Sequence, residues 1–149
     1  MDIEWRFKTF EGLTKTELHE MIILRQQVFV VEQDCPYQDA DEKDKDSHHL
    51  MGYIKGVLVA YLRLVKPGIS YEEMSFGRIV IAQSHRGTGL GVALMKEGIK
   101  QSITLYGTSK NRISAQSYLL PFYQKFGFES TGKEYLEDDI PHTEMIKTI

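Results

Sequence analysis

The residues that decide the fold run from 79 to 91 and read Ile-Val-Ile-Ala-Gln-Ser-His-Arg-Gly-Thr-Gly-Leu-Gly. An apolar run with the length of a buried strand leads into a glycine turn, Arg86–Gly91, and an apolar helix continues from Leu90 to about Leu105. The first amides of a helix are unpaired, the helix dipole makes that end partly positive, and glycines let a ligand approach the backbone. With the charge of Arg86 beside it, this unit predicts a site for a phosphate or pyrophosphate.

Other interpretations of the glycine turn have to be weighed. It is not a P-loop, because no Gly-Lys-Ser or Gly-Lys-Thr follows it. Its spacing, Gly87-x-Gly89-x-Gly91 at mid-chain, differs from the Gly-x-Gly-x-x-Gly that opens a dinucleotide-binding domain. Taken alone, the turn could serve only to reverse the chain, so a second feature has to decide between these readings.

The bulk composition excludes several classes of protein. A chain of 149 residues with 42% hydrophobic residues can bury the core of one domain, 1–149. The net charge of −3 and the lack of a basic, aromatic stripe argue against a nucleic-acid partner, and no apolar run is long enough to cross a membrane. Cys35, His48 and His49 lack metal-ligand spacing, so no metal is expected. A single cysteine and a polar N-terminus without a signal peptide predict a cytoplasmic location.

The periodicity around the glycine turn predicts alternating strands and helices. Thr14 and Glu17 form a capping box for the first helix, and Gly77 within a strand indicates a bulge or a close approach. The expected elements are a strand at Ile3–Thr9, a helix from Thr14 to near Val31, strands at Leu50–Ile54, Val57–Val65 and Met74–Ala82, the helix at Leu90–Leu105, a strand at Arg112–Gln116, a helix at Ser117–Phe126, and strands at Phe128–Tyr135 and His142–Ile146. This order predicts an α/β (α+β) domain around a mixed sheet.

An acidic segment separates the first helix from the first hairpin. Residues Glu32–His49 contain seven acids against Lys43 and Lys45, a charge of −5. The simpler interpretation is a solvated surface loop. The alternative is an acidic lip that attracts a cationic acceptor such as an amine.

The second feature is the run Tyr123-Gln124-Lys125-Phe126-Gly127-Phe128. Together with Arg86, Gly89 and Gly91, it resembles the two motifs of the GNAT superfamily of N-acetyltransferases, Arg/Gln-x-x-Gly-x-Gly/Ala and Tyr-x-x-x-Gly-Phe, in the same order. The stretches Leu24–Asp39 and Asp139–Met145 are similar to the ElaA-like branch of that superfamily. The resemblance implies a single GNAT domain with a mixed, mostly antiparallel central sheet, flanking helices and a splayed central strand.

The resemblance also implies acetyl-CoA as the co-substrate. The splayed strand would hold its pantetheine arm, the glycine turn would bind its pyrophosphate, and a residue that is often asparagine in the family would contact the arm. The residues at these positions are Ile79, Val80 and Ile81 on the strand, Arg86, Gly87, Thr88, Gly89, Leu90 and Gly91 at the turn, and Gln116 in place of the asparagine.

The implied chemistry is direct transfer of the acetyl group to a primary amine of a small molecule or protein. A backbone N–H on the splayed strand would stabilise the developing oxyanion, and Tyr123 would be the general acid that protonates the leaving thiolate. A purely packing role for Tyr123 remains the alternative. Ser75 occupies the position of the base that some members use, which leaves Glu73, His142 or water as the base.

Two other functions stay open at this point. The first is a non-catalytic module that binds CoA esters as a sensor or an interaction domain, and the second is a protein that binds nucleotide phosphates. By analogy with the family, edge strands near the C-terminus could pair two chains as a homodimer.

Overall fold

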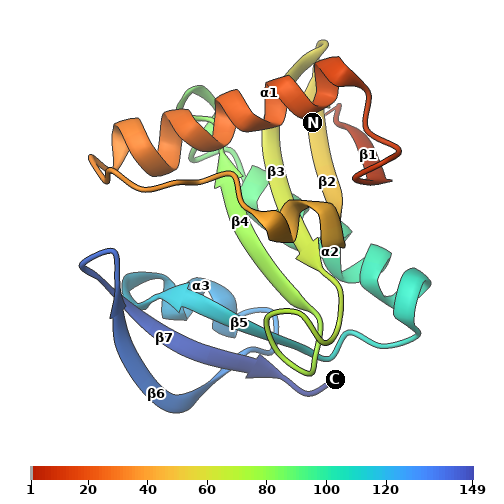
Figure 1. Ribbon diagram of the computed structural model, residues 1–149. Helices are drawn as coiled ribbons and strands as arrows, with labels where there is room; N and C mark the ends of the chain where they lie inside the picture. Colours follow the sequence, from red (N-terminus) through yellow and green to blue (C-terminus); the bar gives the residue numbers. More distant parts are fainter. Residues whose placement is uncertain (1) are drawn as a thin grey trace.

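The computed structural model describes residues 2–149, which form two antiparallel sheets (Figure 1). The first sheet has the order β1-β2-β3-β4 and the second the order β5-β7-β6. The strands of the first sheet are β1 (Glu4–Thr9), β2 (Ser47–Ile54), β3 (Val57–Val65) and β4 (Ser75–Ile81). Those of the second are β5 (Asn111–Gln116), β6 (Glu129–Glu137) and β7 (Ile140–Lys147).

The two sheets are joined by one parallel bridge, between Met74 and Asn111. The Arg112 amide donates to the Met74 carbonyl at 3.1 Å, and the Phe76 amide donates to the Asn111 side-chain oxygen at 3.1 Å. Beyond this point β4 and β5 diverge, as Figure 1 shows. The splayed central strand expected from the sequence is therefore confirmed.

Helices cover both faces of the first sheet. They are α1 (Lys15–Gln26) with its π-helical continuation η1 (Gln27–Glu32), α2 (Leu90–Tyr106) and α3 (Leu120–Gln124); short 3-10 turns are η2 (Glu42–Asp46), η3 (Gln83–His85) and η4 (Ser117–Leu119). The buried apolar side chains of α1, Met21 and Leu24, pack with Tyr61 of β3 on one face. Leu94 of α2 packs with Leu62 of β3 on the other. The alternation of side chains along β3 thus separates two apolar clusters.

Two helix predictions differ from the structure at their ends. The first α-helix ends at Gln26 and continues as a π-helical turn to Glu32 rather than as regular helix to Val31. The helix expected at Ser117–Phe126 is a 3-10 turn followed by the five-residue α3. Pro121 lies at the start of α3, where its missing N–H costs no helical hydrogen bond, so proline begins this helix instead of interrupting it.

The bulge suggested by Gly77 is present. The register of β4 against β3 shifts between Tyr61 and Arg63, and Arg78 adopts a left-handed φ of 51°. Because an extra residue reverses the alternation of a strand, Phe76 and Val80 lie on opposite faces although they are an even number of residues apart. The bulge therefore decides to which face Arg78 is directed.

The capping box at the start of α1 is confirmed. The Glu17 amide donates to Thr14 Oγ1 at 3.0 Å, and the Thr14 amide donates to Glu17 Oε1 at 2.9 Å. The same carboxylate accepts from Lys8 at 2.8 Å and from Arg6 at 3.0 Å on β1. Burial raises the pKa of Glu17, but these donors outweigh it and bring the pKa down to about 2. One side chain thus caps α1 and ties it to the first strand.

Glu17→Gln is expected to lower the free energy of unfolding at pH 7 by about 1 to 2 kcal/mol. Because the folded-state pKa of Glu17 is below its ordinary value of 4.5, this stability is fully present above about pH 4.5 and is lost as the pH falls toward about 2. The difference between wild type and variant in chemical denaturation should therefore shrink from pH 6 to pH 3.

Glu11→Gln is the matched control, because Glu11 is exposed and makes no side-chain hydrogen bond in residues 2–149. It should change stability by less than about 0.5 kcal/mol across the same range. A pH-independent loss in Glu17→Gln would contradict the ionic part of this account.

Candidate acyl-transfer site

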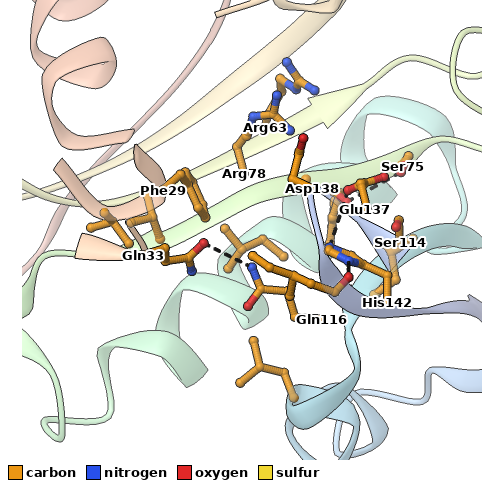
Figure 2. Close-up of a pocket in the computed structure, with 18 of the residues that line it drawn as sticks. Phe29, Gln33, Arg63, Ser75, Arg78, Ser114, Gln116, Glu137, Asp138 and His142 are labelled. Carbon is orange, nitrogen blue, oxygen red and sulfur yellow. Dashed lines mark hydrogen bonds and ion pairs between the residues drawn. The ribbon is translucent and has the colours of Figure 1, made fainter. Parts of the chain in front are cut away.

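A cavity of about 760 Å³ opens where β4 and β5 diverge. Its walls come from β3, β4, β5, η1, η2, the start of α2, α3 and the turn between β6 and β7. Figure 2 shows labelled side chains from η1, β3, β4, β5 and β7 around it. The predicted residues that line it are Ile79, Val80, Ile81, Arg86, Gly91, Gln116, Tyr123 and His142.

The edge of β4 that faces the cavity has no strand paired with it past the Met74–Asn111 bridge, although the Ile81 carbonyl accepts from Arg86 Nε at 3.3 Å. Val80 is the register partner of Tyr61 on β3. Two residues further on, the Ala82 amide donates to the Val59 carbonyl of β3 at 2.8 Å. Since successive backbone groups of a strand point to opposite edges, those of Ile79 and Ile81 point away from β3. Of the three predicted strand residues, these two offer the cavity their backbone, whereas the Val80 backbone faces β3 and its side chain packs under α1.

The glycine turn has the backbone that an anion site requires. Gly87 and Gly89 have left-handed φ angles of 76° and 84°, and Gly89 is the N-cap of α2. The first intrahelical bond is donated by Ala93 to the Gly89 carbonyl, so the amides before it have no helical acceptor. Thr88 uses its hydroxyl locally, donating to the His85 carbonyl at 2.7 Å. The turn therefore presents free amides beside one end of the cavity.

Arg86 lies at this turn but is already paired. Its guanidinium donates to both carboxylate oxygens of Glu32 on η1, at 2.5 and 2.9 Å, and to the Ile81 carbonyl at 3.3 Å. The Arg86 hydrogen bonds hold the pKa of Glu32 below its ordinary value, and Glu32 in turn raises the pKa of Arg86. No local pattern indicates this pairing, because the two residues are 54 positions apart in the chain.

Tyr123 is buried in α3, with ring edges against Phe122 and Phe128. It lines the cavity, and its hydroxyl makes no hydrogen bond within residues 2–149. Burial raises the pKa of this phenol, so it remains a protonated donor at neutral pH. This environment is compatible with both roles that the sequence left as alternatives, packing and proton donation.

His142 and Gln116 are register partners on β7 and β5 and both line the cavity (Figure 2). His142 Nδ1 lies 2.8 Å from the Ile140 carbonyl, which can only accept, so Nδ1 carries the proton in the neutral ring. Nε2 is then free to accept a proton, with the Glu137 carboxylate 3.4 Å away. Gln116 donates to Gln33 at 3.4 Å, which links β5 to the end of η1.

Glu73, the other predicted base, does not line this cavity. Its carboxylate accepts from Arg112 at 2.9 and 3.1 Å, and that guanidinium lowers the pKa of Glu73. A carboxylate held in an ion pair away from the cavity has neither the position nor the basicity to accept the amine's proton. The structure therefore does not bring Glu73 to the cavity, and Ser75, which does line it, offers only a hydroxyl.

The acidic segment is not simply a solvated loop or a free acidic lip. Asp39 and Asp44 are buried, and both pair with the fully buried Arg25 of α1 at 2.8 Å. Charged groups are buried only when they are paired, so the segment is drawn inward by that arginine. The expectation of an exposed acidic surface is therefore wrong for these two residues.

Two further arginines, not predicted as site residues, join this network and line the cavity. Arg63 of β3 donates to Asp41 at 2.7 Å and to Asp44 at 3.0 Å, and Arg78 donates to Asp41 at 3.4 Å. A signal was present in the sequence, because each arginine interrupts an otherwise apolar strand and a charge at such a position needs a partner. The excess of acids in Glu32–His49 supplies those partners.

Comparison with known proteins identifies the class. A family model for the acetyltransferase (GNAT) domain matches residues 14–149, so the chain belongs to the GNAT family. A UPF0039 protein of Synechocystis is 43% identical over 98% of this chain and 96% of its own. The crystal structure of an acyl-CoA N-acyltransferase from Pseudomonas aeruginosa superposes with a TM-score of 0.94 at 40% identity, covering 99% of this chain and 100% of that one. Escherichia coli ElaA superposes with a TM-score of 0.91 at 35% identity, covering 98% and 99%, so the ElaA-like resemblance is confirmed.

Within residues 2–149, no helix has the length and hydrophobicity needed to cross a membrane. The same part of the chain contains no group of three or more histidine, cysteine or acidic side chains placed to hold a metal ion.

Gly89→Ala is expected to destabilise the fold by about 1 kcal/mol or more, because a side chain at a left-handed φ is strained. The same change should weaken binding of CoA, since the first amides of α2 would shift. Chemical denaturation and calorimetric titration with CoA measure the two effects.

Gly91→Ala is the control for the stability effect. Its φ is not left-handed, and an added methyl group would lie 3.6 Å from the Phe122 ring, an ordinary contact. The expected change in unfolding free energy is within about 0.5 kcal/mol. Equal losses in both variants would show that the left-handed φ of Gly89 is not the cause.

Proposed function

We propose that the protein is an N-acyltransferase that transfers the acetyl group of acetyl-CoA to a primary amine. The observation that carries this proposal is the cavity between β4 and β5, which joins an unpaired strand edge, a free helix N-terminus, a buried phenol and a histidine. The 40% identity to a protein described as an acyl-CoA N-acyltransferase supports it. A cytoplasmic location and a homodimer stay predictions from the sequence.

The donor groups present fit acetyl-CoA. Its pyrophosphate would bind the amides of Gly87, Thr88, Gly89, Leu90 and Gly91, with Arg86 as the adjacent charge. Its amide-rich arm suits the backbone groups of Ile79 and Ile81, which would pair with it as a neighbouring strand would. The bound molecule supplies a thioester, which is the activated form of the acetyl group.

His142 would act as the base for the attacking amine. Its Nε2 can accept the proton because Nδ1–H is held by the Ile140 carbonyl. The Glu137 carboxylate, 3.4 Å from Nε2, would then stabilise the imidazolium.

The β4 edge and Tyr123 would act on the thioester. An amide of Ile79 or Ile81 can donate to the carbonyl oxygen as negative charge develops on it. Tyr123 can donate its proton to the leaving sulfur, since burial keeps the phenol protonated and no other group in residues 2–149 engages it. Binding, activation and proton transfer are thus divided among the backbone, His142 and Tyr123.

A non-catalytic CoA-ester sensor is the second candidate, and the Arg86–Glu32 pair is the observation that favours it. A ligand anion could exchange with the Glu32 carboxylate and so report its presence through η1. A binder of nucleotide phosphates in general would use the same turn but would not need Tyr123 or His142.

Incubation with acetyl-CoA and a panel of primary amines should release free CoA thiol, measured with a thiol reagent. Tyr123→Phe should lower kcat by about 100-fold, because it removes the proton donor while leaving the ring in place. Its affinity for CoA should stay unchanged, as measured by calorimetry.

Tyr106→Phe controls for loss of a phenol elsewhere, because Tyr106 does not line the cavity. It should keep the wild-type rate. Tight CoA binding without thiol release on any amine would support the sensor, and preference for ATP over CoA would support the nucleotide binder. A wild-type rate in Tyr123→Phe would remove the general-acid role alone.

His142→Asn should lower kcat/KM by about 100-fold at pH 7, since asparagine can still donate to the Ile140 carbonyl but has no basic nitrogen at the Nε2 position. The loss should shrink as the assay pH approaches the pKa of the amine acceptor, because more of the amine then arrives neutral. Initial rates between pH 6.5 and 9.5 test this.

His48→Asn is the matched control, because His48 stacks on Phe7 outside the cavity. The variant removes an imidazole ring but leaves the residues that line the cavity unchanged. It should follow the wild-type pH profile. If His142→Asn keeps the wild-type profile as well, water is the base.

A further inference from the structure

The wall of the cavity formed by β3, β4 and η2 carries hydrogen-bond donors that the protein does not use. Arg63 makes its ion-pair bonds through Nη1. Arg78 donates to Asp41 and to the Asp39 carbonyl through Nη2, and its Nε lies 2.9 Å from Asp39 Oδ1. The Arg63 side chain is only 5% exposed, yet its Nε has no hydrogen-bond partner within residues 2–149. A buried N–H without an acceptor is unfavourable, so this cluster is suited to an acceptor group from outside the chain.

The charge of this wall is positive once internal pairing is counted. Arg25, Arg63 and Arg78 are balanced by Asp39, Asp41 and Asp44, which leaves the network neutral. Lys43 on η2 also lines the cavity and forms no ion pair within the described chain. An anion at this wall would therefore meet the unused Nε–H of Arg63 and one uncompensated positive charge, that of Lys43.

The bulge in β4 places Arg78 in this wall. Arg78 has a left-handed φ of 51°, which is strained for a residue with a side chain. The reversed alternation directs it to the face of the sheet where Arg63 and Asp41 lie. Figure 2 shows Arg63 and Arg78 next to each other at the cavity.

The neighbouring wall has the opposite character. Glu137 and Asp138 lie at the turn between β6 and β7, and both line the cavity together with His142. Glu137 lies 3.4 Å from His142 Nε2, and within residues 2–149 no lysine or arginine forms an ion pair of 4 Å or less with Glu137 or Asp138. The cavity is therefore bipolar, with a place for an ammonium group near Glu137, Asp138 and His142 and a place for an anion at Arg63 and Lys43.

We infer that the amine acceptor also carries a carboxylate, so that the substrate is an amino acid or a similar zwitterion. Its carboxylate would bind Arg63, Arg78 and Lys43, while its amine would lie at Glu137, Asp138 and His142. This inference rests on the proposed transferase function and narrows the acceptor from any cationic amine to one with an anionic group. A carboxylate on the acyl group is the other source of the same chemistry.

The test uses glutamate, lysine and phenylalanine as acceptors of the acetyl group from acetyl-CoA. Each free amino acid is compared with the derivative in which the α-carboxylate is replaced by an amide. At least one acid should be preferred over its amide by about tenfold or more in kcat/KM, chiefly through KM, because the amide lacks the charge that this wall binds. Lys43→Gln should reduce that preference by about threefold or more. Lys45→Gln removes the same charge from the same 3-10 turn, outside the cavity and paired with Glu42, and should leave the preference unchanged.

Arg78→Lys is the second variant, chosen because it keeps the charge that Asp41 needs while removing the planar guanidinium. It should raise KM for the acid and leave KM for the amide unaltered. An unchanged thermal unfolding midpoint and CoA affinity confirm that it is folded. Calorimetry of the same acceptors with CoA-saturated protein provides a readout that does not depend on turnover.

The outcomes separate the inference from the proposed function. Turnover of amides and acids at equal rates overturns the inference and leaves the transferase in place. Selective, Lys43-dependent binding of acids without turnover supports the inference and overturns catalysis. If acids are neither bound selectively nor acetylated, the inference and the proposed transferase function are both overturned. A preference for succinyl-CoA over acetyl-CoA that Lys43→Gln abolishes, without preference among acceptors, assigns the anion to the acyl group and overturns the inference.

Discussion

The bridge between Met74 and Asn111 is the constraint on which the rest of the site depends. It fixes β4 and β5 side by side at one end, and Asn111 adds a second bond through the Phe76 amide. Past that point the two strands separate, and the backbone groups on the open edge of β4 have no strand to pair with. Unpaired backbone groups near the centre of a fold are costly, so this edge gains by pairing with an extended ligand. A continuous sheet would be more stable but would have no cavity.

The buried arginine Arg25 has a comparable role for the wall of the cavity that contains Arg63 and Arg78. Its pairs with Asp39 and Asp44 connect α1 to a long irregular segment that otherwise contributes little apolar surface. Burying ions costs solvation energy, so these pairs are weak support for overall stability. Their consequence is positional, because moving the segment would leave a charge buried without a partner. The wall that contains Arg63 and Arg78 is thereby held in one place.

The features predictable from the sequence were those with local causes. The capping box at Thr14, the bulge at Gly77 and the strand, glycine turn and helix around Arg86 each depend on residues within a few positions. The pairings of Arg86 and Glu73 were missed because their partners lie 54 and 39 positions away. Counting charges in a segment gives its sign but not which carboxylates are neutralised, and that depends on the tertiary fold.

The turn η1 connects the two ends of the cavity. Its Glu32 holds Arg86 at the glycine turn, and the next residue, Gln33, accepts from Gln116 at the end of β5. An anion that binds at the turn has to compete with the Glu32 carboxylate for the same guanidinium. The binding free energy that Arg86 adds is then the difference between its pairing with the bound anion and its pairing with Glu32. The free amides at the start of α2 must therefore supply much of the affinity. Glu32 and Gln33 are adjacent in η1 and its C-cap, so two neighbouring residues hold the glycine turn and the end of β5.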